Sequence, residues 1–309
     1  MRDQSVLLHF CLRRKYEILS AIEHLTKRVI PMRFEMALIQ MSVVGGNKAR
    51  NLARAQGMIA AAAAHGSRLV VLPEALDLGW THPSSQIDAE PIPDGEPYRR
   101  LAQSAAMHGV YVCAGLTERF GDQVFNSAVI VDKKGERLCV HRKINELDIG
   151  HPFYAQGDRL NVVHTELGSL GLMICADGFA KDHVLSRSLG YMGADIILSP
   201  CAWAVSGDHD NDKEPYGDTW RMAYKPVAQE FSLWMAGVSN VGVINAGPWV
   251  GHKCIGCSLV MGPRGEEVLQ GPYGVDAETI LYVDVDLTKR PARGCSWYEH
   301  WTTHDEDRP

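Results

Sequence analysis

Residues 168–182 read GSLGLMICADGFAKD, and this stretch sets the first expectation about the fold. Its apolar run predicts a buried β-strand, which ends on Cys175 where Asp177 and Gly178 break the pattern. A free cysteine often serves only as a small buried hydrophobic residue. The alternative is that the carboxyl end of the strand presents the Cys175 thiol to a pocket.

Strands and helices alternate on both sides of this stretch. Two hairpins are expected, over residues 125–144 with an Asp-Lys-Lys-Gly turn and over residues 254–271. An α/β protein with mixed sheets covered by helices follows from this alternation. Between the apolar strand-like runs, helical patterns are predicted over about 47–65, 96–108, 181–193 and 218–231.

The chain has 309 residues, of which 46% are hydrophobic, so it can bury a sizeable core. No linker divides it, and we expect one domain over residues 32–287. A helical appendage at 1–31 precedes this domain, and a polar tail at 288–309 follows it and is expected to dock on another surface, such as a partner subunit. Arg13, Arg14 and Lys15 stand where a signal peptide would need small residues, which favours a cytoplasmic protein.

The composition also bears on partners and cofactors. A net charge of −6 without a basic face argues against nucleic acid, and no apolar run approaches the roughly 20 residues that span a membrane. The eight cysteines show no compact disulfide spacing, and Cys254 and Cys257 lack the second pair that a zinc site needs. The acidic loop at 206–218 lacks the glycine and glutamate of a calcium loop. We expect no metal and no cofactor.

Three chemically versatile side chains stand at the ends of strand-like runs. Glu74 ends RLVVLPE, Lys143 follows ERLCVHR, and Cys175 ends GLMIC. In a covered α/β sheet, strand ends and the loops that leave them form the ligand crevice. A thiol is mostly protonated near neutrality, so Glu74 could accept its proton as a general base. Lys143 could stabilise the oxyanion that forms when the thiolate attacks a carbonyl.

The order and context of these residues resemble the carbon–nitrogen hydrolase (nitrilase) superfamily. The motifs are LVVLPEAL around Glu74, HRKI around Lys143 and GLMICAD around Cys175. GADIILSPCAW, SNVG at 239–242 and the late GCSLVMGPRGEEV segment agree as well, so the resemblance covers about residues 33–287. One such motif alone is weak, but three in order are specific.

The resemblance implies an α-β-β-α four-layer sandwich with two mixed sheets, which dimerises into an eight-layered assembly as a homodimer or a higher homo-oligomer. It implies metal-free hydrolysis of a non-peptide C–N bond through a cysteine thioester. In that mechanism Glu74 is the general base, Lys143 stabilises the oxyanion and Cys175 is the nucleophile. The backbone N–H of Ala176 is expected to be a second oxyanion donor.

The resemblance fails at a fourth catalytic position. Many members carry a second glutamate about eight residues after the lysine, but that count reaches His151 here. Either Glu146 fills the role from a rearranged loop, or His151 replaces it, or the role is absent. We favour Glu146 as the fourth catalytic residue and keep His151 as a candidate substrate-binding residue.

The substrate is expected to be a small amide, carbamoyl amide or nitrile in a largely aromatic pocket. Asp177 follows the cysteine by two, as in aliphatic amidases and carbamoylases, and favours amides. Asp177 and Trp203 are candidate substrate-binding residues together with Ala176. The alternatives are a nitrilase with the same three residues and a non-catalytic member that keeps only the fold. The further aromatic residues expected in the pocket wall are Trp80, Phe153, Tyr154 and Phe179.

Overall fold

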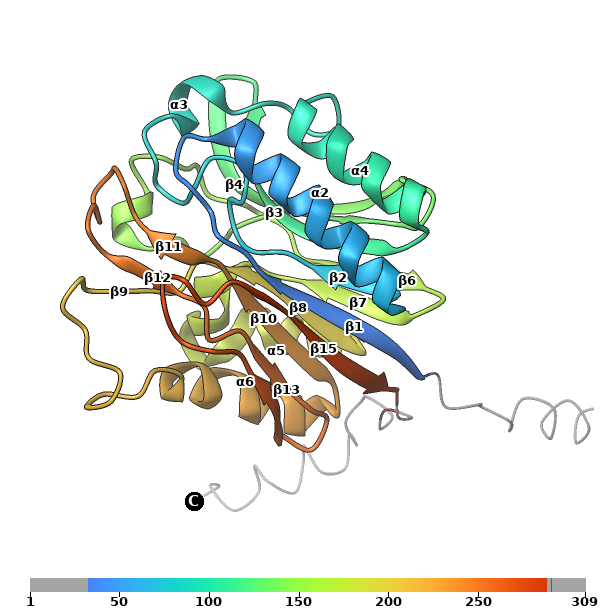
Figure 1. Ribbon diagram of the computed structural model, residues 1–309. Helices are drawn as coiled ribbons and strands as arrows, with labels where there is room; N and C mark the ends of the chain where they lie inside the picture. The colour runs from blue at the N-terminus through green and yellow to red at the C-terminus, as the bar shows by residue number, and fades with distance from the viewer. Residues whose placement is uncertain (1–32, 288–289, 291–309) are drawn as a thin grey trace, which may run out of the picture. The chain divides into compact units, whose positions relative to one another are not determined.

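The computed structural model describes residues 33–287 and residue 290. Two six-stranded mixed sheets form the body of the protein (Figure 1). The first has the order β15-β1-β2-β3-β4-β5 and the second the order β14-β13-β10-β8-β7-β6. The strands of the first sheet are β1 (Arg33–Gln40), β2 (Leu69–Val71), β3 (Tyr111–Phe120), β4 (Gln123–Val131), β5 (Arg137–Arg142) and β15 (Thr279–Asp286). Those of the second are β6 (Asn161–Thr165), β7 (Gly168–Leu172), β8 (Ile196–Cys201), β10 (Trp234–Ser239), β13 (Leu259–Met261) and β14 (Glu267–Gln270).

Helices cover the outer faces of both sheets. Figure 1 shows α2 and α4 over the first sheet and α5 and α6 beneath the second. The remaining elements are a small sheet in the order β11-β12-β9 and several short helices. The helices are α2 (Lys48–His65), α3 (Ser85–Asp88), α4 (Glu96–His108), α5 (Val184–Tyr191) and α6 (Asp218–Phe231), with the 3₁₀ turns η1 (Asp148–Gly150), η2 (Cys175–Phe179) and η3 (Lys181–His183). The strands of the small sheet are β9 (Ala204–Val205), β11 (Val241–Val243) and β12 (Lys253–Ile255).

The alternation of side chains along β1 explains the layering. Met36 and Leu38 point into the core that the two sheets share, whereas Ala37 and Ile39 pack with residues of α2 and α4. Successive side chains of a strand point to opposite faces, so a strand that is apolar on both faces must be covered on both. The expected α-β-β-α sandwich with two mixed sheets is therefore confirmed, while the dimer stays a prediction.

The predicted helices at 96–108 and 218–231 match α4 and α6, and the helix predicted from residue 47 is α2 with Asn47 as its N-cap. The second hairpin is smaller than expected. Only β13 and β14 pair as a hairpin, because the chain turns at Cys257, with φ +58°, and β12 joins the small sheet instead. The predicted appendage at 1–31 and all of the tail at 288–309 except Arg290 lie outside the described residues.

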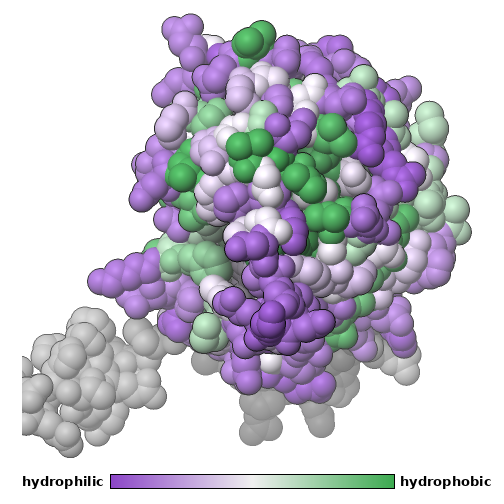
Figure 2. Space-filling model, turned by 60° about the vertical axis from the view of Figure 1, so that its left-hand side comes forward, coloured by the Kyte–Doolittle hydropathy of each residue, from purple (hydrophilic) through white to green (hydrophobic). Residues whose placement is uncertain are grey.

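The outer surface next to the small sheet is largely polar. The side of the molecule that carries β9, β11 and β12 comes forward in Figure 2, where hydrophilic residues predominate and hydrophobic ones occur in small groups. Within residues 33–287, no helix combines the length and the apolar character that a bilayer crossing requires.

Candidate active site

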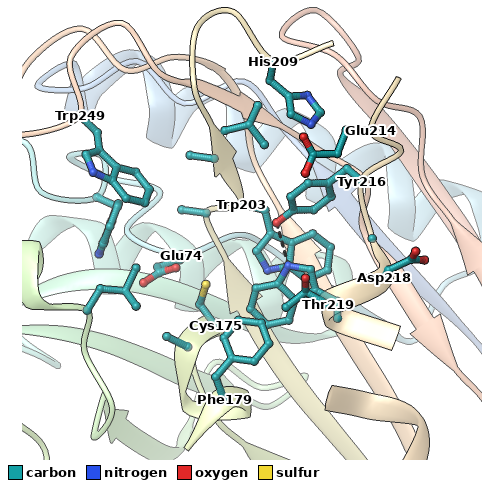
Figure 3. Close-up of a pocket in the computed structure, with 18 of the residues that line it drawn as sticks. Glu74, Cys175, Phe179, Trp203, His209, Glu214, Tyr216, Asp218, Thr219 and Trp249 are labelled. Carbon is teal, nitrogen blue, oxygen red and sulfur yellow. Dashed lines mark hydrogen bonds between the residues drawn. The ribbon is translucent and has the colours of Figure 1, made fainter. Parts of the chain in front are cut away.

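The structure brings Glu74, Lys143 and Cys175 into one pocket, although they come from distant parts of the chain (Figure 3 shows Glu74 and Cys175). The Lys143 ammonium lies 2.8 Å from Glu74 Oε1 and 2.9 Å from Glu146 Oε1. All three of these charged side chains are at most 4% exposed. Lys143 is therefore a buried ammonium between two buried carboxylates, unlike the solvated charges of a surface cluster. It can act on a molecule that enters the pocket.

Glu74 is held by the strands around it. It follows β2, and its backbone N–H donates to the carbonyl of Cys201 at 3.2 Å. Its Oε1 accepts a hydrogen bond from Asn126 Nδ2 at 2.6 Å. Gly115 on β3 permits this approach, since a Cβ at that position would lie 2.5 Å from the Glu74 Cα. The carboxylate is therefore positioned by β3 and β4 as well as by its own segment.

Lys143 leaves the end of β5, where its N–H donates to the Asn126 carbonyl at 2.8 Å. Its own carbonyl accepts from the Gly157 N–H at 2.8 Å, so the backbone is fixed on both sides. The ammonium also lies 5.6 Å from the centre of the Trp80 ring. These contacts hold a long, flexible side chain in one place inside the pocket.

Glu146 lies in the cluster and His151 does not. The second oxygen of Glu146 accepts from Asn126 Nδ2 at 3.0 Å, so one amide bridges both carboxylates. Gly150 leaves room for Glu146, because a Cβ there would lie 2.6 Å from its Cγ. His151 follows η1 on the exposed surface and does not line the pocket. The loop turns back after Glu146, which a count of residues along the chain could not reveal.

The protonation states follow from burial and mutual contact. Burial, contact with the Cys201 thiol and the charge of Glu74 raise the pKa of the Cys175 thiol well above its usual range, although Lys143 opposes them. Burial also raises the pKa of Glu74 against the opposing effect of Lys143. Burial alone would lower the pKa of Lys143, but Glu74 and Glu146 outweigh it and raise that pKa. The thiol at rest is protonated, beside a carboxylate whose basicity is increased.

Cys175 does not end the strand as expected. β7 ends at Leu172, and Cys175 opens η2 with φ +43°, a conformation that non-glycine residues rarely adopt. Its N–H donates to Ser199 Oγ at 3.1 Å. Ala176 follows the cysteine in η2 and also lines the pocket. A backbone N–H at this position, beside the thiol, suits an oxyanion.

Asp177, a candidate substrate-binding residue, lies in a buried network outside the pocket wall. Its side chain is fully buried and absent from the pocket wall. One oxygen accepts from the N–H groups of Ile144 and Asn145 at 3.0 and 2.7 Å, and the other lies 2.7 Å from His141 Nε2. Burial alone would raise the pKa of Asp177, but His141 and the backbone donors lower it below its usual range. Asp177 ties the segment after Lys143 to the cysteine segment.

The pocket has a volume of about 440 Å³ and an aromatic wall. Trp203, Trp80 and Phe179 line it as expected, whereas Phe153 and Tyr154 do not. The indole N–H groups of Trp80 and Trp203 are buried without a hydrogen-bond partner in the described part of the chain. Three further aromatic residues of the wall were not expected from the sequence: Tyr216, Trp220 and Trp249.

Cys254 and Cys257 lie in the interior, whereas the loop at 206–218 lies mostly at the surface. Cys254 and Cys257 are free and buried, and burial raises the pKa of each to about 12. Over residues 33–287, no group of three histidine, cysteine or acidic side chains is arranged to hold a metal. The loop at 206–218 contributes His209 and Glu214 to the pocket rim (Figure 3).

A four-layer sandwich that buries a cysteine beside a lysine and two carboxylates defines an enzyme class, the cysteine-dependent hydrolases of C–N bonds. Comparisons with known proteins agree with this class. A nitrilase from Pyrococcus abyssi is 31% identical over 260 residues, which are 82% of this chain and 91% of the relative. An omega-amidase NIT2 from Danio rerio is 27% identical over 266 residues, 82% of this chain and 89% of the relative.

One solved structure shares the fold at low identity. It is a variant of the amidase from Nesterenkonia sp. AN1 after Michael addition of acrylamide at its active-site cysteine, with a TM-score of 0.67 and 21% identity over 82% of this chain and 93% of that chain. A family model described as carbon-nitrogen hydrolase matches residues 35–291. The chain belongs to the carbon–nitrogen hydrolase family.

Proposed function

We propose that this enzyme hydrolyses a small amide or carbamoyl amide through a thioester on Cys175. The observation that carries the proposal is the ion cluster in which Lys143 contacts both Glu74 and Glu146, in the pocket that Cys175 lines. A resting thiol with a raised pKa needs a proton acceptor, and Glu74 is the carboxylate beside it.

In the first half of the reaction, Glu74 accepts the Cys175 proton as the sulfur attacks the carbonyl carbon. The oxyanion that forms accepts hydrogen bonds from the Lys143 ammonium and the Ala176 N–H. The C–N bond then breaks, and the leaving nitrogen takes the proton from Glu74 and departs as ammonia or an amine.

In the second half, a water molecule gives a proton to Glu74 and attacks the thioester. The C–S bond breaks, the proton returns to the sulfur, and the carboxylic acid leaves. Glu146 acts as a positioning residue in both halves, because it binds Lys143 and Asn126, and both of these also bind Glu74. The general base Glu74 and the positioning residue Glu146 thus both contact the Lys143 ammonium.

The competing activity is nitrile hydrolysis, since the relative from Pyrococcus abyssi carries the name nitrilase. The same thiol would add to the nitrile carbon and form a thioimidate, which two waters would convert to acid and ammonia. Ammonia release from matched pairs, such as hexanamide and hexanenitrile, separates the two. We expect the amide to have the higher kcat/KM, and a clear preference for the nitrile would overturn the amide assignment.

The covalent step is tested by mass spectrometry of the intact protein, quenched in acid during turnover of an amide. We expect an added acyl mass that Cys175→Ser abolishes. Cys201→Ser is the matched control, because Cys201 is also a buried free cysteine near the site and should leave the adduct in place. An adduct that survives Cys175→Ser, or no adduct with any hydrolysed amide, would refute the thioester.

A further inference from the structure

The charges of the pocket are unequally distributed. Lys143 is the one lysine among the described residues that line the pocket, and no arginine is among them. Its charge is already opposed by Glu74 and Glu146. The rim adds two carboxylates, Glu214 and Asp218, so acidic groups outnumber basic ones. The other basic side chain of the wall is His209, whose Nδ1 lies 2.8 Å from the Tyr273 hydroxyl. A ligand that brings a negative charge would therefore meet no unopposed lysine or arginine among the lining residues.

The two acidic residues of the rim differ in their partners. Asp218 Oδ1 accepts from Arg221 Nη1 at 2.9 Å, and Arg221 also lies 2.5 Å from Glu267, so that cation is already satisfied. The carboxylate of Glu214 makes no hydrogen bond or ion pair with the described residues. Glu214 is therefore the negative charge of the rim that remains available to a ligand.

Aromatic rings line the space between this rim and the thiol. Trp203 stacks on Trp220 with 4.5 Å between ring centroids, and Tyr216 lies 6.1 Å from Trp203. Figure 3 shows Trp249 on the opposite side of Glu74 and Cys175 from this group. The faces of aromatic rings attract ammonium and guanidinium groups, especially where water is partly excluded. Aromatic walls also accept an uncharged chain. The Glu214 carboxylate and the shortage of basic residues in the pocket favour a ligand with a cationic end over one with an uncharged end.

We propose, resting on the proposed amide hydrolysis, that the natural substrate carries an ammonium or guanidinium group at the end remote from the scissile carbonyl. The carbonyl lies at Cys175, and the cationic end lies between the aromatic walls near Glu214. An amide that carries a carboxylate at that end is a poor substrate. Glu214 is then the residue that determines charge specificity.

The test compares three amides of equal length and different end charge. They are 6-aminohexanamide, hexanamide and adipamate, and kcat/KM is measured from ammonia release. We expect 6-aminohexanamide to be preferred over hexanamide by about tenfold, from cation–π contacts and one partly solvated charge. Adipamate should be the poorest. Hydrolysis of hexanamide or adipamate without a preference for the cation would overturn this inference and leave the proposed function standing.

Variants of the rim assign the effect. Glu214→Gln should lower the ratio of kcat/KM for the cationic over the neutral amide by about threefold to tenfold. Asp212→Asn removes the same charge from the same loop outside the pocket wall, and it should leave that ratio within about twofold. Glu214→Lys should reverse the order of the cationic and anionic amides. An unchanged ratio in Glu214→Gln refutes the role of Glu214, and no ammonia from any amide refutes the proposed function.

Discussion

Replacement of Glu146 by glutamine should lower kcat/KM without unfolding the protein. The change keeps the shape of the side chain and removes its charge. In the structure that carboxylate accepts from Lys143 Nζ at 2.9 Å and from Asn126 Nδ2 at 3.0 Å. Its charge also contributes to the raised pKa of Glu74. The variant therefore holds the Lys143 ammonium less firmly and also lowers the basicity of Glu74.

The size of the effect follows from these contacts. A hydrogen bond to a charged group contributes about 1.5–3 kcal/mol, against about 1 kcal/mol for a neutral pair. The glutamine oxygen retains part of the contact with Lys143 but turns an NH₂ group toward one of the two donors. The net loss is about 2–4 kcal/mol, and about 1.4 kcal/mol corresponds to a factor of ten in rate. We expect kcat/KM to fall by about 30-fold to 1,000-fold.

The assay is continuous ammonia release from an amide substrate, with a thermal melt of each variant as a check on folding. Two matched controls come from the same loop. Asp148→Asn removes the neighbouring exposed carboxylate, and His151→Ala removes the other candidate for the fourth position. Both should stay within about threefold of the wild type, as surface changes usually do. If Glu146→Gln also stays within threefold, or if His151→Ala loses as much, the reasoning about the cluster is wrong.

Three more changes test other parts of the site. Cys175→Ser should reduce turnover by more than about a thousandfold and leave the circular dichroism spectrum unchanged, because a hydroxyl is a far poorer nucleophile; near-native rates would exclude the thioester. Gly115→Ala should displace Glu74 and lower kcat, because its Cβ would lie 2.5 Å from the Glu74 Cα. Urea unfolding measured beside the kinetics separates a loss of stability from a loss of activity. An unchanged kcat would contradict the role of Gly115 in positioning Glu74. Asp177→Asn should lower the free energy of unfolding by about 2–4 kcal/mol at pH 7, because a buried charged partner of His141 is lost. Since the pKa of Asp177 is lowered on folding, its contribution is present above the unfolded value of about 3.9 and is lost as the pH falls through the folded value. Urea midpoints of wild type and variant should converge below that range, and a constant difference would contradict this assignment.

The catalytic cluster could be predicted because strand ends converge. Glu74 and Lys143 follow β2 and β5 of the first sheet, and Cys175 follows β7 of the second. The loops that leave strand ends commonly form the ligand crevice of a covered sheet, and here all three residues line one pocket. The sequence could not show that β7 stops at Leu172 and that Cys175 takes a left-handed conformation. Backbone strain of this kind depends on the structure around a residue, so it cannot be predicted from local sequence propensity.

The pocket wall was harder to predict than the cluster. Trp220 has the spacing of a buried residue on α6, but a periodic pattern tells only that a face is covered, not that it faces a cavity. The same limit explains Asp177, which stands next to the cysteine segment and points into a buried network instead of the pocket. At a turn, two residues that are close in the sequence can have side chains that point in different directions.

The reacting groups and the pocket rim belong to different parts of the architecture. The former stand on the rigid ends of two sheets, while much of the rim, including His209, Glu214 and Tyr216, comes from the connection between β9 and α6. Exchange of that one connection could retarget the enzyme to new amides and leave the bond-breaking apparatus as it is. For protein engineering, the scaffold thus offers a module for selectivity that is separable from its reactivity.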